Sequence, residues 1–235
     1  MNDELTVSSA MKETLPTVFG YIGIAMAFGI VGRSAGLSPM LCLLMSMITY
    51  GGASQFVAIS MLSAHSPLLS IIFSVFLVNS RMILMTTTLA PYFKRDSLLK
   101  NILIGGIVTD ESFALGMNKL NYTNKTLNFS WFNTVNLMAY AAWNIATLAG
   151  ALLGNVIGDP DKYGLDFAIV AMFIGLAYLQ LISDRSIAFS LQLIVVGVVL
   201  ILVFVGLIFI PSNMLILMVT LIACFFGVVM KHAFF

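Results

Sequence analysis

Long apolar stretches separated by short polar breaks run through most of this chain. A helix needs about 20 apolar residues to cross about 30 Å of hydrocarbon. Stretches of that length predict seven or eight membrane-spanning helices, near residues 15–35, 39–62, 67–91, 101–118, 129–157, 165–183, 187–209 and 212–230. Runs such as 193–210 lack the period-two alternation of a membrane β-barrel. The pattern therefore predicts an all-α polytopic membrane protein.

Composition supports this assignment and excludes several classes of function. Hydrophobic residues make up 60% of the chain and charged residues 9%, whereas soluble domains carry about 25% charged residues. A formal net charge of +1 leaves no basic patch for phosphates, so no nucleic-acid partner is expected. No P-loop, dinucleotide fingerprint, zinc-protease motif or nucleophile elbow appears. We therefore expect neither an enzyme nor a cofactor or metal site.

The segments suggest one transmembrane domain, 1–235, with a duplication inside it. Two similar motifs, at 53–58 and 142–147, lie 89 residues apart and each contain a small residue and an amide. An odd number of spans per copy would give halves of inverted topology, here 15–95 and 100–185. Chance similarity in a low-complexity apolar sequence is the alternative.

The last two segments form a predicted helical hairpin, 187–231. No charged side chain occurs between residues 186 and 230, so this hairpin is not expected to line a hydrated path. A scaffold or a surface for a partner subunit is the expected role.

Three charged residues lie where a membrane makes them expensive. Arg81, Asp110 and Glu111 fall near the middle of their segments, where a charge costs about 2.5–3.5 kcal/mol on insertion scales. One carboxylate would pair with Arg81, and a buried carboxylate without a cation tends to take up a proton. Because adjacent residues point about 100° apart on a helix, the other acid is free to face a pathway. Asp110 and Glu111 are the candidates for proton coupling, and a purely structural ion pair is the alternative.

A glycine-rich polar stretch interrupts the second segment. Gly51 and Gly52 weaken the helix, and Ser54 and Gln55 follow at once. A broken helix offers its positive end to a carboxylate and free carbonyls to an ammonium, as transporters do for small zwitterions. We expect these four residues to bind substrate. The alternative is that the glycines only let a neighbouring helix approach.

Two further amides, Asn79 and Asn144, lie within predicted spans and join the substrate-binding candidates. The segment that contains Asn144 also carries a series of small residues at every fourth position. This series predicts a seam of close helix packing, formed by Ala142, Ala146, Gly150, Gly154 and Gly158.

Orientation depends on how many segments cross. If all eight do, the basic residues divide evenly between the two sides. The cluster Lys94, Arg95 and Lys100 favours a cytoplasmic loop, which places the N-terminus outside if the first three segments all span. A re-entrant segment among them would reverse that placement.

Several motifs resemble the AzlC-type branched-chain amino acid permeases, which are the large subunits of two-component exporters. They occur in the order GGASQFVA at 51–58, LVNSR at 77–81, TDESFAL at 109–115, GALLG at 150–154 and GLDFA at 164–168. The likeness spans about residues 15–185. Two positions depart from the family pattern: Ser80 replaces an apolar residue, and Met82 replaces a histidine that follows the arginine.

The resemblance implies a permease of the cytoplasmic (inner) membrane. Its implied activity is export of branched-chain amino acids, and of other apolar ones such as methionine, by proton antiport with a small AzlD-type membrane subunit. Losing a histidine at Met82 puts any proton relay through that position in doubt. A channel-like pore and a non-transporting assembly subunit remain as alternatives.

Overall fold

A computed structural model describes residues 3–157, 188–209 and 212–234, together with Ile174, Tyr178 and Leu181. Within these residues the chain is helical and contains no strand. The chain divides into two compact units, Met1–Phe173 and Ile174–Phe235. The predicted span 165–183 lies almost wholly outside the described residues, as does Gly158.

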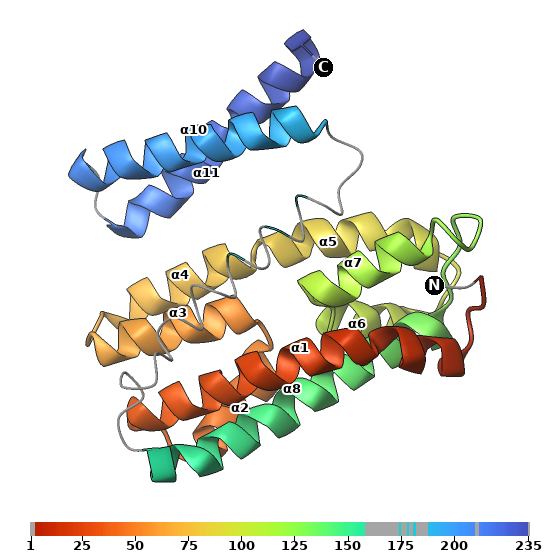
Figure 1. The fold of residues 1–235 in the computed structure, drawn as a ribbon, viewed down its shortest axis with the longest axis horizontal. Helices are drawn as coiled ribbons and strands as arrows, with labels where there is room; N and C mark the ends of the chain where they lie inside the picture. The colour runs from red at the N-terminus through yellow and green to blue at the C-terminus, as the bar shows by residue number, and fades with distance from the viewer. Residues whose placement is uncertain are drawn as a thin grey trace. The chain divides into compact units, whose positions relative to one another are not determined.

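Nine helical elements make up the described part of the first unit (Figure 1). They are α1 (Val7–Ser34), α2 (Pro39–Thr49), α3 (Gly52–Ser63), α4 (Leu68–Asn79), α5 (Arg81–Leu89), the 3-10 helix η1 (Ala90–Phe93), α6 (Leu98–Gly106), α7 (Asp110–Lys119) and α8 (Phe129–Ile157). The second unit contributes α10 (Phe189–Phe209) and α11 (Ser212–Phe234), which pack against each other.

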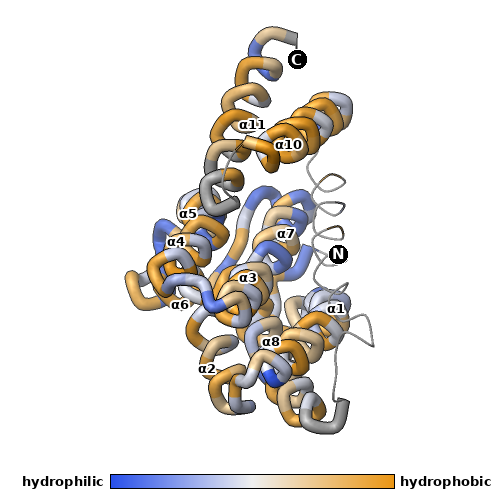
Figure 2. Tube along the Cα trace, turned by 90° about the vertical axis from the view of Figure 1, so that its left-hand side faces the viewer, coloured by the Kyte–Doolittle hydropathy of each residue, from blue (hydrophilic) through white to orange (hydrophobic). Residues whose placement is uncertain are grey.

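Four helices in the described ranges are long and apolar enough to cross a membrane. They are Val7–Ser34, Leu68–Phe93, Phe129–Gly154 and Phe189–Phe209. Hydropathy along the trace shows hydrophilic positions gathered around α7, whereas α10 is hydrophobic over most of its length (Figure 2). The all-α polytopic architecture is confirmed, whereas the predicted number of seven or eight spans is not.

The first unit is built on two long helices, α1 and α8, that run parallel in close contact. A Cβ added to Gly29 would meet the backbone of α8 at Thr147, and one added to Gly150 would meet the backbone at Met26. A Cβ at Gly154 would meet the Cβ of Arg33 at 2.8 Å. The predicted packing seam is therefore confirmed at Gly150 and Gly154, since only glycine lets two helix backbones approach this closely.

The predicted span 39–62 is wrong as a single crossing helix. The chain breaks at Tyr50, which takes a left-handed conformation with φ 37°, and Gly51 then begins a new helix. Ser46 of α2 lies 2.8 Å from Gln55 of α3. The side chains of Cys42 and Ile59 both approach the position of Gly32. Since Cys42 precedes Ser46 and Ile59 follows Gln55, α3 runs back alongside α2, and the two form a hairpin of half-length helices.

The predicted span 101–118 is wrong in the same way. α6 ends at Gly106, and α7 begins at Asp110 behind the cap residue Thr109. Lys100 lies over the ring of Phe129 at the start of α8, and the backbone oxygen of Ile104 accepts a bond from Asn136 further along. α7 then returns to the same end of α8, because a Cβ at Gly116 would meet the ring of Phe132 at 2.6 Å.

The two hairpins enter from opposite ends of the α1–α8 pair (Figure 1). The tip of α2–α3 and the tip of α6–α7 both reach the middle, where α4 gives way to α5 at Ser80. Each half-helix of 9–12 residues is about 14–18 Å long. This length carries a tip to roughly the middle of a 30 Å hydrocarbon layer.

These hairpins change the expected orientation. With 39–62 folded back, the N-terminus and the loop at Lys94–Lys100 lie at one end of the unit. The side chain of Asn128 bonds the backbone of Leu5 there, and Lys100 contacts Phe129. An outside N-terminus was expected only if the first three segments all cross, and 39–62 does not. The basic cluster Lys94, Arg95 and Lys100 therefore favours a cytoplasmic N-terminus.

The second predicted half, 100–185, extends beyond residue 157 into residues that the structure does not describe. The duplication of 15–95 and 100–185 therefore stays a prediction, as does the single domain 1–235. The motifs at 53–58 and 142–147 have different surroundings. The first begins a half-helix at a hairpin tip, whereas the second lies inside the uninterrupted α8.

Candidate functional site

The strongest polar contact in the middle of the first unit joins α5 to α7. Arg81 Nη2 lies 2.8 Å from Asp110 Oδ2, and the two side chains are 33% and 13% exposed. Arg81 Nε is buried and has no hydrogen-bond partner within the described residues. Asp110 therefore occupies one corner of the guanidinium and leaves an adjacent donor unused.

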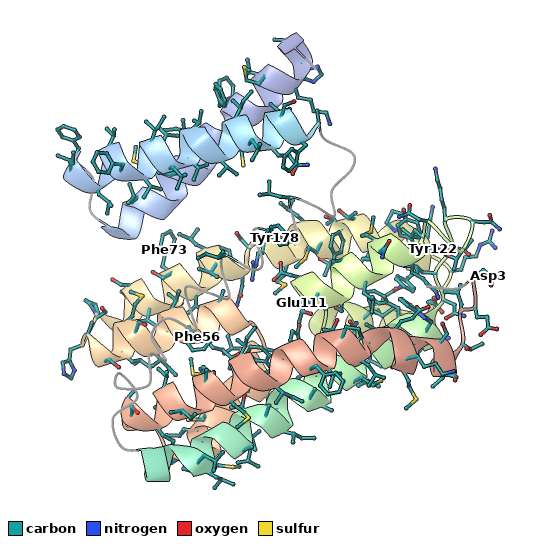
Figure 3. All side chains as sticks on the ribbon, viewed as in Figure 1. Asp3, Phe56, Phe73, Glu111, Tyr122 and Tyr178 are labelled. Atoms are coloured by element: carbon teal, nitrogen blue, oxygen red, sulfur yellow. The ribbon has the colours of Figure 1, made fainter. Side chains whose placement is uncertain are left out.

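Glu111 lies between α7 and α1 (Figure 3). Its Oε2 accepts a 2.6 Å hydrogen bond from the hydroxyl of Tyr21, which also lies 2.7 Å from Thr109 Oγ1. Among the described residues Glu111 takes part in no ion pair. The two neighbouring acids thus have different partners, a guanidinium for Asp110 and a phenol for Glu111.

The start of α7 is fixed by its own sequence. Thr109 and Ser112 form a capping box, in which each side chain bonds the backbone N–H of the other residue. The carboxylates of Asp110 and Glu111 follow in the first turn, where the positive end of the helix favours them. Sequence reasoning missed Tyr21 and this helix start, and the Thr109–Ser112 spacing was the available signal.

The tip of the first hairpin is built around Gly51. No side chain caps α3 here, and Ser54 Oγ donates a 2.7 Å bond to the Gly51 carbonyl. A Cβ on Gly51 would stand 2.9 Å from Asn79 Oδ1. That amide oxygen is buried and unpartnered among the described residues, so Asn79 presents a free acceptor directly beside the tip.

Gln55 holds three helices together from within. Its Nε2 donates to Ser46 Oγ at 2.8 Å, and its Oε1 accepts from Trp143 Nε1 at 3.1 Å. Ser46 in turn lies 2.9 Å from the hydroxyl of Thr147. Gln55 is fully buried, so its hydrogen-bonding groups face the protein interior.

Aromatic rings surround the polar groups. Tyr21 and Trp143 pack edge-to-face with centroids 5.0 Å apart, and Tyr50 and Tyr140 do so at 4.7 Å. Tyr21, Tyr50 and Trp143 belong to one buried cluster, to which Ile107 of the second hairpin also packs. The Tyr50 hydroxyl is buried with no hydrogen-bond partner in the described part of the chain.

Asn144 is placed on α8 beside Trp143. Its Nδ2 donates to the Tyr140 carbonyl at 2.8 Å, within its own helix, and its Oδ1 is unpartnered among the described residues. The structure thus brings Asn79 beside Gly51 at the first tip, and Arg81 beside Asp110 at the start of α7. Gln55 bonds Trp143 of α8, and Asn144 lies on α8 itself. In the described ranges no three His, Cys, Asp or Glu side chains gather as metal ligands would.

This arrangement defines a multi-pass membrane protein with two broken-helix hairpins and a polar, charged centre. A family model described as AzlC protein matches residues 16–157, and the chain belongs to this family. A predicted location in the membrane is confirmed by this membership and by the apolar helices. No solved structure matches the chain.

Several curated proteins are similar over most of their length. "Inner membrane protein YgaZ" of Escherichia coli (strain K12) is 30% identical over 80% of this chain and 79% of its own. "Branched-chain amino acid transport protein AzlC" of Bacillus subtilis (strain 168) is 29% identical over 76% and 69%. An uncharacterized membrane protein of Archaeoglobus fulgidus is 34% identical over 68% and 69%.

Proposed function

We propose that this protein is a secondary transporter of the cytoplasmic (inner) membrane that exports branched-chain amino acids, and other apolar ones such as methionine, by proton antiport. It acts as the large subunit beside a small AzlD-type membrane protein. The observation that carries the proposal is the meeting of two broken-helix tips around unused polar groups. Membership of a family that includes a branched-chain amino acid transport protein supports the substrate class.

The polar groups at the centre match the two ends of a zwitterion. Among the described residues, Arg81 Nε is an unused donor for a carboxylate. Two acceptors there suit an ammonium: the unpartnered Asn79 Oδ1 and the Glu111 carboxylate, which forms no ion pair. The uncapped start of α3 at Gly51 and Gly52 adds backbone N–H groups and a positive helix end. Irregular backbone at membrane depth is tolerated where it is buried in protein or faces a polar cavity.

Residues behind these groups set their positions. Ser54 and Gln55 shape the tip from within, through the Gly51 carbonyl and the Ser46–Trp143 network. Asn144 donates to the Tyr140 carbonyl within α8, and its Oδ1, which has no partner among the described residues, is left for substrate. The rings of Tyr21, Tyr50, Tyr140 and Trp143 offer an apolar surface of the kind that suits an aliphatic side chain.

Counterflow of labelled leucine in proteoliposomes tests the proposal. The full chain is reconstituted with and without its small partner, loaded with unlabelled leucine, and diluted into labelled leucine with or without methionine. Transient accumulation that methionine suppresses is the expected result. Rapid, non-saturable equilibration without counterflow would indicate a pore instead, and no flux with folded protein in every condition would contradict transport.

A further inference from the structure

The two acids at the start of α7 are not equivalent, and the difference assigns them separate roles. Asp110 already has a cation 2.8 Å away. Glu111 accepts a hydrogen bond from the hydroxyl of Tyr21, and among described side chains no Lys, Arg or His forms an ion pair with it. A carboxylate in this position lacks a counter-charge, and either a proton or a cationic group of a ligand can supply one.

The surroundings of Glu111 suit a substituted ammonium. Tyr21 packs edge-to-face against Trp143. Tyr50 belongs to the same cluster; it is 7% exposed, and its hydroxyl has no partner among the residues that the structure describes. Aromatic faces near a carboxylate are the combination that proteins use to hold alkylammonium groups.

The groups that face Glu111 allow one further cation and no more. Tyr21 comes from α1, Tyr50 from the end of α2 and Asp110 from its own helix, and Arg81 of α5 is engaged with Asp110. Arg81 and Asp110 cancel in charge, so the described centre carries one surplus negative charge. One proton on Glu111 neutralises this charge. A zwitterionic substrate leaves the net charge unchanged, but its ammonium needs the ionised form of Glu111, so a proton on Glu111 and an ammonium beside it exclude each other.

We propose that the ammonium of the amino acid and the transported proton compete for the single carboxylate of Glu111, while the Arg81–Asp110 pair remains formed and Arg81 Nε receives the substrate carboxylate. This inference rests on the proposed transport function and adds its coupling step. Substrate binds as Glu111 gives up one proton to the aqueous side that is open. The empty carrier returns when Glu111 takes one up, which is an exchange of proton for amino acid.

Proton release on binding tests this step. The full chain with its small partner, purified in weakly buffered detergent solution, is titrated with leucine while pH is recorded. One proton released per leucine bound is expected, and the apparent Kd should rise about tenfold per unit fall in pH once Glu111 is protonated. Leucine binding with no proton release, or with proton uptake, would overturn the competition and leave transport standing.

Variants and leucine analogues assign the site. Glu111→Gln should abolish proton release. It should also lower the affinity for leucine, and for 3-methylbutylamine, which carries only the ammonium, at least about tenfold. The affinity of the variant for 4-methylpentanoate, which carries only the carboxylate, should stay within about threefold of that of the native chain. This binding would show that the variant is folded. Glu111→Asp should restore release, and Asp96→Asn, which removes a carboxylate paired with Lys100 away from this centre, should keep it.

The opposite pattern of variants overturns the assignment. If Asp110→Asn abolishes release and Glu111→Gln keeps it, Asp110 is the proton site and the competition at Glu111 is wrong. If the native chain binds neither leucine nor 4-methylpentanoate, the proposed function itself fails. The failure of transport and the failure of this coupling step are thus separate results.

Discussion

The guanidinium of Arg81 and the carboxylate of Asp110 meet 2.8 Å apart where both of their helices begin. A carboxylate is favoured at the positive end of a helix, and a cation is not. Asp110 therefore compensates Arg81 for an unfavourable place at the start of α5. The pair also connects the second hairpin to α5. Arg81, the first residue of α5, comes two positions after Asn79, which lies beside the tip of the first hairpin.

Breaking this pair from either side should destabilise the protein. Arg81→Met and Asp110→Leu should each lower the free energy of unfolding by about 1–3 kcal/mol. This range lies below the about 3–5 kcal/mol of fully buried pairs because Arg81 is one-third exposed. The double variant should recover most of the loss, since no lone charge remains. Thermal unfolding in detergent measures all three, and additive losses would contradict a coupled pair.

Gly51 should tolerate no side chain. A Cβ there would stand 2.7 Å from Ser54 Oγ and 2.9 Å from Asn79 Oδ1, so Gly51→Ala should displace the acceptor beside the tip and reduce leucine flux at least about tenfold. Gly23→Ala is the matched control, because a Cβ at Gly23 meets nothing within 4 Å. Equal flux in the two variants would show that the tip does not depend on this contact.

Cysteine accessibility should reveal the two hairpins. In a background with Cys42→Ala and Cys224→Ala, single cysteines at Ala35 and Ala64 flank the α2–α3 hairpin. Both should label from the same side of the membrane. If residues 39–62 crossed, the two positions would label from opposite sides.

The same experiment gives orientation. Among described residues of the first unit, six basic side chains lie at the end that carries the N-terminus. They are Lys12, Lys94, Arg95, Lys100, Lys119 and Lys125. Arg33 lies at the other end. The positive-inside rule then predicts a cytoplasmic N-terminus. Cysteines replacing Ser97 and Tyr122 should label from the cytoplasm only, and labelling from outside would contradict this orientation.

A second ion pair should contribute to stability and not to transport chemistry. Lys119 at the end of α7 is fully buried, lies 2.8 Å from Glu13 of α1, and stacks over Trp131. Lys119→Met alone should cost about 3–5 kcal/mol because it leaves Glu13 without its cation. Adding Glu13→Leu should recover most of the stability, as read from thermal unfolding. Leucine affinity of the folded double variant should stay within about threefold of the native chain.

The sequence alone predicted the features that depend on the free-energy cost of single residues within a helix or a membrane. Gly51 and Gly52 predicted the break between α2 and α3, and the expense of mid-membrane charge predicted that Arg81 would pair with one acid and leave the other. The fourfold spacing of small residues predicted the packing of α8 on α1.

Other features depend on direction and distance, which hydropathy does not encode. A broken apolar stretch has the same hydropathy profile whether the chain continues across the membrane or folds back. Both hairpins were therefore predicted as spans. Tyr21 was one aromatic among many in an apolar run, and its bond to Glu111 joins residues 90 positions apart. Glu13 and Lys119 lay near segment ends, where charges are ordinary.

The most direct test of the account is leucine accumulation driven by a proton gradient. Proteoliposomes containing the full chain and its small partner are prepared with an acidic lumen and diluted into alkaline medium with labelled leucine. The account predicts accumulation that is abolished by a proton ionophore and by Glu111→Gln. Accumulation that ignores the gradient, or that survives Glu111→Gln unchanged, would contradict proton antiport through this centre.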